Sequence, residues 1–181
     1  FFSFEPSGVH PDIVCLSKSI SGSGLPLALV LIRPEIDAWS PGEHNGTFRG
    51  NNLAFVGATA ALAYWEDDAL SRAVAAKGAH VRARLERIVE RASGLARGVR
   101  GRGLIVGMEC APGVAEAISQ AAFPRGLIVE TAGATDQVLK ILPPLVIPEA
   151  ALDEGLDIVE RCALEIAARP GAGKVEAQGT A

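Results

Sequence analysis

One lysine stands at the end of the most strand-like stretch of the chain. The apolar run Ile13–Leu16 is short enough for one buried strand, and it stops abruptly at Ser17-Lys18-Ser19 and the glycines that follow. A second apolar run, Leu25–Ile32, comes next. Because both runs are almost continuously apolar, we expect two strands buried on both faces of a parallel or mixed sheet. Lys18 is therefore predicted to lie at the end of an interior strand.

Spacing alone leaves two interpretations of Lys18 open. A lysine in a turn is most often a plain surface residue, whereas a lysine held between hydroxyls beside a packed core can act as a Schiff-base nucleophile. The pair Gly46-Thr47 also allows two interpretations. The pair comes before a predicted helix, where a small residue and a hydroxyl can bind an anion, but it also fits an ordinary connecting loop.

Composition narrows the class of protein. The chain has 181 residues, 49% of them hydrophobic, which is enough to bury a core. A formal net charge of -4 disfavours a nucleic-acid partner, which needs a basic face. The uncharged stretch Leu53–Trp65 is too short to cross a bilayer, so no membrane partner is expected. Three cysteines without a Cys-x-x-Cys pair, together with three scattered histidines, disfavour a disulfide framework and a metal site and favour a reducing, cytoplasmic compartment.

Helical and strand-like patterns alternate along the rest of the chain. Asn51 or Asn52 can cap a helix that runs to about Trp65, and a long amphipathic helix follows until Ser93-Gly94. Beyond Gly98 we expect strand structure over 99–109, 127–131 and 138–142, and helices over about 114–122 and 149–168. This order predicts a small α+β domain. Its three strand glycines, which do not form the dinucleotide fingerprint, are predicted as bulges or points of close approach: Gly101, Gly103 and Gly107.

With its neighbours, the Lys18 segment resembles the class III aminotransferases, which are pyridoxal-phosphate enzymes of fold type I. The match runs through Pro11-Asp12-Ile13-Val14, the lysine turn and Gly24-Leu25-Pro26, and extends over about the first 165 residues. The resemblance implies an α/β fold. It also implies that the chain is the C-terminal piece of a longer polypeptide. The expected division is the end of the large cofactor-binding domain over 1–66, a linking helix over 67–97, the small domain over 98–168 and a loose tail over 169–181.

The same resemblance implies roles for four residues. Lys18 matches the lysine that anchors pyridoxal phosphate and moves the proton during amino transfer. Gly46 and Thr47 match the pair that binds the cofactor phosphate of the neighbouring subunit, which implies a homodimer or a higher homo-oligomer. Lys140 stands where many members have an arginine that grips a substrate carboxylate. A lysine offers only a point charge there, so its role is either a looser contact or that of a plain surface residue.

Three further parts of the family's site match no residue of this chain. They are the aspartate at the ring nitrogen, the phosphate cup and the aromatic that stacks on the ring, all of which lie before Phe1 in the family. We therefore expect that these 181 residues alone do not turn over. Phe1–Phe4, in a predicted loop, also need an apolar surface from elsewhere in the protein.

A narrower resemblance points to one reaction. Phe1–Glu5, Leu16–Gly22 and Pro41–Asn52 are most similar to the branch that converts L-glutamate and L-aspartate 4-semialdehyde to L-2,4-diaminobutyrate and 2-oxoglutarate, the first step of ectoine biosynthesis under osmotic stress. The expected partners are thus small amino acids and oxo acids. Members that act on 4-aminobutyrate, ornithine or acetylornithine are the alternative, and Gly42–Thr47 and Val138–Lys140 argue against them. An inactive truncated product is the other alternative.

Overall fold

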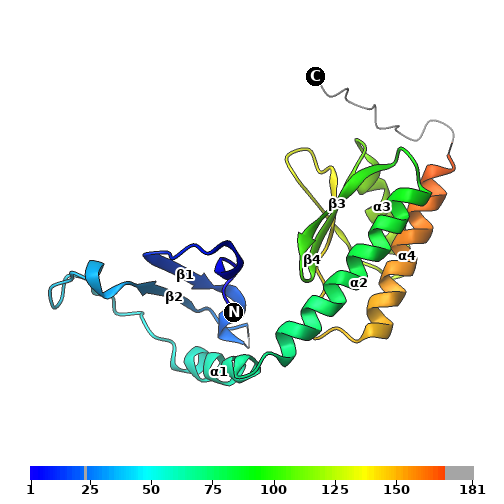
Figure 1. The fold of residues 1–181 in the computed structure, drawn as a ribbon. Coiled ribbons are helices and arrows are strands. Elements are labelled where there is room, and N and C mark those ends of the chain that lie inside the picture. The colour runs from blue at the N-terminus through cyan, green and yellow to red at the C-terminus, as the bar shows by residue number, and fades with distance from the viewer. Residues whose placement is uncertain (23, 170–181) are drawn as a thin grey trace. The chain divides into compact units, whose positions relative to one another are not determined.

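The described part of the chain forms two compact units. The computed structural model describes residues 1–22 and 24–169, and its first unit is Phe1–Ser71, while the second begins at Arg72 (Figure 1). The predicted tail over 169–181 lies outside the described residues except for Arg169. The finer domain division stays a prediction.

The first unit contains one hairpin and one full α-helix. In chain order its elements are η1 (Glu5–Ser7), β1 (Ile13–Ser17), η2 (Lys18–Ser21), β2 (Ala28–Ile32), η3 (Pro34–Ile36), α1 (Asn52–Leu62) and η4 (Ala63–Trp65). Strands β1 and β2 pair antiparallel, with Ile13 opposite Ile32 and Ser17 opposite Ala28. Arg33 closes the open end of the hairpin, because its Nη1 donates to Asp12 Oδ1 at 2.9 Å.

The predicted burial of this hairpin on both faces is wrong. Ile13 is 54% exposed and Val30 is 56% exposed, although both belong to the apolar runs. Within the described residues no third strand joins the sheet, so side chains that would lie inside a larger sheet remain on the surface. The strands themselves were predicted from local pattern, but their burial depends on whatever packs on them.

Helix α1 begins where the sequence predicts it. The side chain of Asn51 accepts hydrogen bonds from the backbone N–H groups of Leu53 at 3.1 Å and Ala54 at 3.3 Å, which is the expected N-cap geometry. The helix continues as η4 to Trp65, whose ring meets that of Phe1 edge to face with centroids 5.2 Å apart. Trp65 thus supplies part of the apolar surface that the N-terminal phenylalanines were predicted to need.

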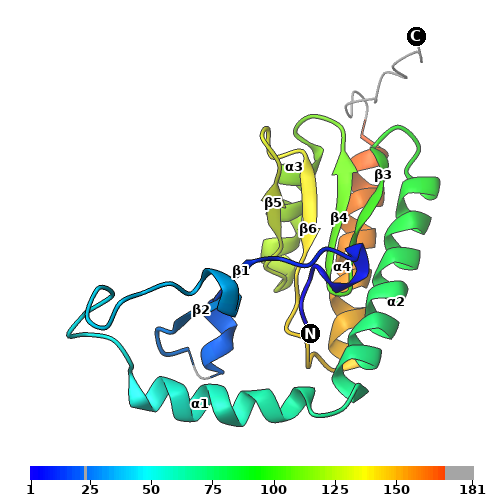
Figure 2. The same cartoon turned by 60° about the vertical axis from the view of Figure 1, so that its left-hand side comes forward.

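The second unit is an antiparallel sheet packed against helices (Figure 2). Its elements are α2 (Ala69–Arg91, whose first three residues belong to the first unit), β3 (Ala96–Arg102), β4 (Ile105–Cys110), α3 (Val114–Ala122), η5 (Phe123–Arg125), β5 (Glu130–Ala132), β6 (Val138–Ile141) and α4 (Glu149–Ala167). The strand order is β3-β4-β6-β5. The helices predicted over 114–122 and 149–168 are confirmed, and so is the long amphipathic helix before them. Strand structure predicted over 99–109 is a hairpin, because Gly103 turns the chain at φ +53°.

The core of the second unit lies between one sheet face and the helices. Alternate residues of β4 point into it, as expected for an antiparallel sheet with one covered face. Helix α2 contributes one stripe at helical spacing, and α4 contributes another. The fully buried large side chains include Val81, Leu85, Ile88, Val106, Met108, Ile118, Leu139, Leu156 and Val159.

Glycines allow close approaches in this unit, both to backbone and to side chains. A Cβ on Gly78 of α2 would lie 2.3 Å from the carbonyl oxygen of Gly103, so the helix packs directly on the β3–β4 turn. A Cβ on Gly101 would lie 2.1 Å from the carbonyl oxygen of Ile105, and one on Gly107 would lie 2.6 Å from a methyl of Val138. Gly101, Gly103 and Gly107 were predicted to be bulges or points of close approach, and all three are points of close approach, since a Cβ on Gly103 would lie 3.0 Å from a methyl of Val74.

Replacing Gly78 should distinguish the effect of its close contact with Gly103 from the effect of helix propensity. Alanine is favoured over glycine in a helix by about 0.8–1.0 kcal/mol, but a Cβ at Gly78 must push backbone apart. We expect Gly78→Ala to lower the free energy of unfolding by about 1–3 kcal/mol, the usual cost of overpacking. Urea unfolding of the chain, followed by circular dichroism, measures it.

Gly155→Ala is the matched control. Gly155 also lies inside a helix, but its Cβ would meet Leu127 Cδ1 at 3.5 Å, an ordinary contact. This variant should raise the free energy of unfolding by up to about 1 kcal/mol. Equal stabilisation by both substitutions would contradict the close packing of α2 on the turn.

Candidate active site

Lys18 occupies a strained position directly after β1. It is the first residue of η2, and its φ of +60° is one of two positive values at non-glycine residues in the described part of the chain. Such backbone strain costs about 1–3 kcal/mol and clusters at functional sites. The predicted place at the end of a strand is confirmed, but the interior location is wrong, because the residue is exposed. Within the described residues its ammonium has no side-chain partner.

A surface hollow of about 550 Å³ lies beside this lysine. It is lined by Lys18, Ser19 and the segment Gly24–Ala28, so the lysine turn and the start of β2 form its walls. Ligand sites in proteins commonly measure about 300–1,000 Å³. The hollow therefore offers a cation and a hydroxyl in a space large enough for a small organic molecule.

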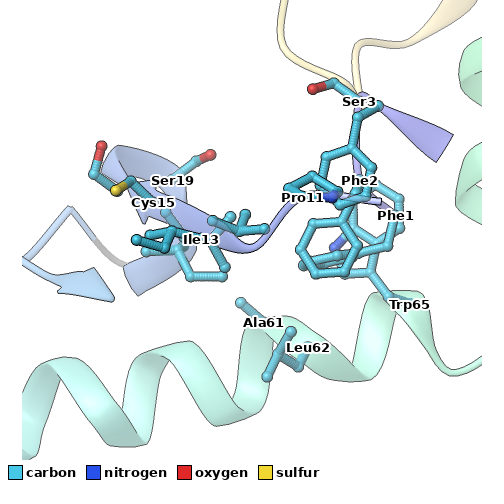
Figure 3. A pocket seen from close by; sticks show the side chains of 15 residues that line it. Phe1, Phe2, Ser3, Pro11, Ile13, Cys15, Ser19, Ala61, Leu62 and Trp65 are labelled. Atoms are coloured by element: carbon cyan, nitrogen blue, oxygen red, sulfur yellow. The ribbon is translucent and has the colours of Figure 1, made fainter. Parts of the chain in front are cut away.

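A second pocket of about 510 Å³ lies on β1, and its wall mixes apolar and polar groups (Figure 3). Phe1, Phe2 and Trp65 form one wall, and Ala61 and Leu62 of α1 point toward β1 from below. None of its lining residues carries a charged side chain. The pocket therefore lacks the charged side chains that an anionic ligand requires.

Gly46 and Thr47 belong to an exposed loop between η3 and α1. Arg49 organises this loop, because its Nη1 donates to the His44 carbonyl at 2.9 Å and its Nη2 to the Asn45 carbonyl at 3.2 Å. A Cβ on Gly46 would lie 2.8 Å from Arg49 Nε, so the guanidinium fills the space that a side chain would take. The loop thus combines a glycine, a threonine hydroxyl and a cation, a set that can bind a phosphate.

The pair Gly46-Thr47 precedes α1, as predicted, but residues 48–51 separate it from the first residue of the helix. Helix α1 starts at Asn52 and has Asn51 as its N-cap. Gly50 has a φ of +82°, which is not helical, so the helix cannot begin before Asn51. Arg49 and the loop, rather than the helix N-terminus, are the groups available to an anion at Thr47. The sequence did not single out Arg49. A basic residue two positions after Thr47 in a glycine-rich loop was the signal for it.

Lys140 belongs to the second unit and is already paired. It lies on β6 directly opposite Glu130 of β5, and its Nζ is 2.7 Å from Glu130 Oε2. The hydrogen bond from Lys140, and then its charge, lower the pKa of the Glu130 carboxyl. A substrate carboxylate at Lys140 would have to compete with Glu130. Glu130 could not be identified from sequence, because the β5–β6 register was not predictable.

The predicted site residues fall into three separate groups. Lys18 lies in the turn after β1, Gly46 and Thr47 lie in the loop before α1, and Lys140 lies in the other unit. Within the described residues of the first unit, no hydrogen bond or ion pair joins Lys18 to Gly46 or Thr47. In the same part of the chain, no group of three or more His, Cys, Asp or Glu side chains could hold a metal ion, and no helix could span a membrane.

Sequence comparison gives a family and several relatives. The family model described as "Aminotransferase class-III" matches residues 1–163. Diaminobutyrate–2-oxoglutarate transaminase of Virgibacillus pantothenticus is 55% identical over 162 residues, which are 88% of this chain and 39% of the relative. The protein of that name in Vibrio cholerae is 55% identical over 167 residues, or 91% of this chain and 41% of the relative. The chain thus spans about two fifths of the length of these curated relatives.

Solved structures give the same fold. Acetylornithine aminotransferase of Elizabethkingia anophelis superposes with a TM-score of 0.79 at 32% identity, covering 91% of this chain and 41% of that one. Ornithine aminotransferase of Toxoplasma gondii gives a TM-score of 0.80 at 28% identity, with coverage of 90% and 39%. The fold is accordingly α/β and corresponds to part of fold type I, the fold of these pyridoxal-phosphate-dependent enzymes. The chain belongs to the class-III aminotransferases.

Proposed function

We propose that the protein containing this chain transfers the amino group of L-glutamate to L-aspartate 4-semialdehyde, giving L-2,4-diaminobutyrate and 2-oxoglutarate for ectoine biosynthesis. The observation that carries the proposal is the position of Lys18, a strained lysine at the end of a strand on the wall of a hollow. The choice of reaction is supported by identity. It is 55% to a diaminobutyrate–2-oxoglutarate transaminase but 28–32% to ornithine and acetylornithine aminotransferases.

The residues in the first unit fit pyridoxal phosphate. Lys18 would hold it covalently through Nζ, and the hollow beside the lysine gives it room. Gly46, whose Cβ space is filled by the Arg49 guanidine, and the Thr47 hydroxyl would bind the cofactor phosphate of the neighbouring subunit. When bound, the cofactor supplies an electron-withdrawing ring that stabilises negative charge on the substrate carbon.

Lys18 also has a proton to move. Once free, its Nζ would take the proton from the substrate carbon that bears the nitrogen and pass it on to the cofactor. In the second half of the exchange it would carry a proton back to the carbon of the oxo acid that becomes the new amino acid. A lysine can do this from one place only if its turn is held still. Proton transfer by Lys18 therefore requires a rigid backbone over residues 18–22 as well as the amine itself.

The first unit also presents surface suited to a second copy of the chain. Residues 52–65 carry no charge, and Leu53 and Val56 on α1 are 72% and 69% exposed. Phe48, next to Thr47, is fully exposed. The exposed apolar groups of α1 and the exposed Phe48 support a homodimer in which Thr47 meets the partner's cofactor. The compartment we propose is the cytoplasm.

Lys140 is our proposed contact for a substrate carboxylate. It lines a hollow of about 410 Å³ with Pro143, Ile147 and residues of α4. The ion pair with Glu130 orients the ammonium of Lys140. A substrate carboxylate would replace the Glu130 carboxylate as the partner of that ammonium.

Borohydride reduction of the protein that contains this chain tests the role of Lys18. With pyridoxal phosphate bound, reduction and peptide mapping should label Lys18, and Lys18→Ala should lower turnover by at least about 10²–10⁴-fold, the scale of general acid–base catalysis. Lys77 donates to the carbonyl of Ile147 and serves as the unlabelled control. A label on Lys77 or Lys140 would reject the proposal.

Comparing amino donors tests the proposed substrates. In the direction that consumes 2-oxoglutarate, kcat/KM for L-2,4-diaminobutyrate should exceed the values for 4-aminobutyrate, ornithine and acetylornithine by about tenfold or more. A preference for one of those three would move the protein to another branch of the family while leaving the role of Lys18 intact.

Thr47→Ala should weaken cofactor retention. The substitution removes one hydrogen bond to a charged phosphate, which is worth about 1.5–3 kcal/mol. Equilibrium dialysis with pyridoxal phosphate measures the loss. Thr59→Ala is the control, because the Thr59 hydroxyl donates to the Phe55 carbonyl within α1. Unchanged affinity in Thr47→Ala would remove Thr47 from the site.

A further inference from the structure

The turn that carries Lys18 rests on the small-residue face of α1. Gly22 ends this turn with a φ of +71°, and its N–H donates to the Ser19 carbonyl at 3.0 Å. A Cβ on Gly22 would lie 2.6 Å from Ala61 Cβ and 2.8 Å from the carbonyl oxygen of Gly57. Residues 57 and 61 are four apart and share one helix face. Turn and helix are therefore in contact through backbone, with no flexible side chain between them.

Ser21 indicates how closely this turn packs. It is fully buried, the only buried polar or charged residue in the described part of the chain. Its hydroxyl lies 3.4 Å from the carbonyl oxygen of Lys18, the residue whose backbone is strained. Burial of Ser21 and the contact of Gly22 thus both hold the C-terminal end of a turn whose first residue is Lys18.

We propose that the Gly22 contact with α1 fixes the position of the Lys18 amine, which makes Gly22 and Ala61 positioning residues for the proposed amino transfer. The inference rests on the proposed function, because it concerns the lysine that acts there. Lys18 adopts a positive φ that a lysine does not favour, so the surrounding structure must impose it. The turn lies against α1, and Gly22, four residues after Lys18, permits the close approach to Gly57 and Ala61. Pushing Gly22 off α1 lets the turn relax and moves the amine.

Displacing the amine should lower the rate of the chemical step more than it weakens substrate binding. A displacement of about 1 Å at a reacting group can lower a rate on the order of 10²-fold. Neither Gly22 nor Ala61 lines the hollow beside Lys18, so neither variant removes a contact to a molecule bound there.

The experiment uses the holoenzyme that contains this chain and compares Gly22→Ala with Gly8→Ala. Gly8 has a φ of +68°, and a Cβ there would meet nothing within 4 Å, so it matches the backbone cost of Gly22 without the contact. We expect Gly22→Ala to lower kcat on the order of tenfold to a hundredfold at nearly constant KM. We also expect it to shift the pH midpoint of the absorbance band of the lysine-bound cofactor. Gly8→Ala should change neither.

Ala61→Val tests the same contact if the Gly22→Ala variant does not fold. It enlarges the same contact from the helix side without any positive φ, and Thr59→Val places the same residue on an exposed position of α1. Ala61→Val should shift the band and kcat as Gly22→Ala does, and Thr59→Val should not. A pH midpoint and kcat equal to those of the controls would overturn the positioning role alone. A lysine-bound band that survives in Lys18→Ala would instead overturn the proposed function.

Discussion

The candidate site depends on one reversal of the chain between β1 and β2. Within five residues the backbone twice adopts a positive φ, at Lys18 and at Gly22. Glycine accepts this conformation at no steric cost, but lysine does not, and the cost at Lys18 is about 1–3 kcal/mol. Packing at the end of the turn offsets this strain, because Ser21 is buried and Gly22 lies on the backbone of α1. A lysine in an unconstrained turn would relax to negative φ, and its amine would point elsewhere.

Local pattern was enough to predict most helices and strands. The helix at 114–122 and the long helices on either side of it have amphipathic spacing, and their partners belong to the same unit, so the periodicity and the burial agree. In the hairpin β1–β2 the sequence pattern and the burial do not agree. Its strands were correct, but its side chains are exposed because burial is a property of neighbouring layers and not of the strand.

The site was predictable only as far as it follows chain order. Lys18, Gly46 and Thr47 were identified from motifs of adjacent residues and from the family resemblance. Arg49 and Glu130 were missed, since each depends on a side-chain direction or a cross-strand register that single-sequence reasoning does not provide. Gly22 was visible as a glycine, but its role depends on the approach of α1, which comes much later in the chain.

The two units differ in how far they bury their own residues, and the difference bears on catalysis. The second unit encloses a continuous core between its sheet and helices. Among the described residues of the first unit only Ser21, Ala54 and Ala58 are buried, although this unit carries Lys18 and Thr47. Its uncharged α1 is hydrophobic on all sides, which is typical of a helix that is covered in the assembled protein. The same helix supports the Lys18 turn on one face. In the homodimer that we propose, covering the other faces of α1 would also stiffen the support of Lys18, so assembly and the placement of the amine would be one structural requirement.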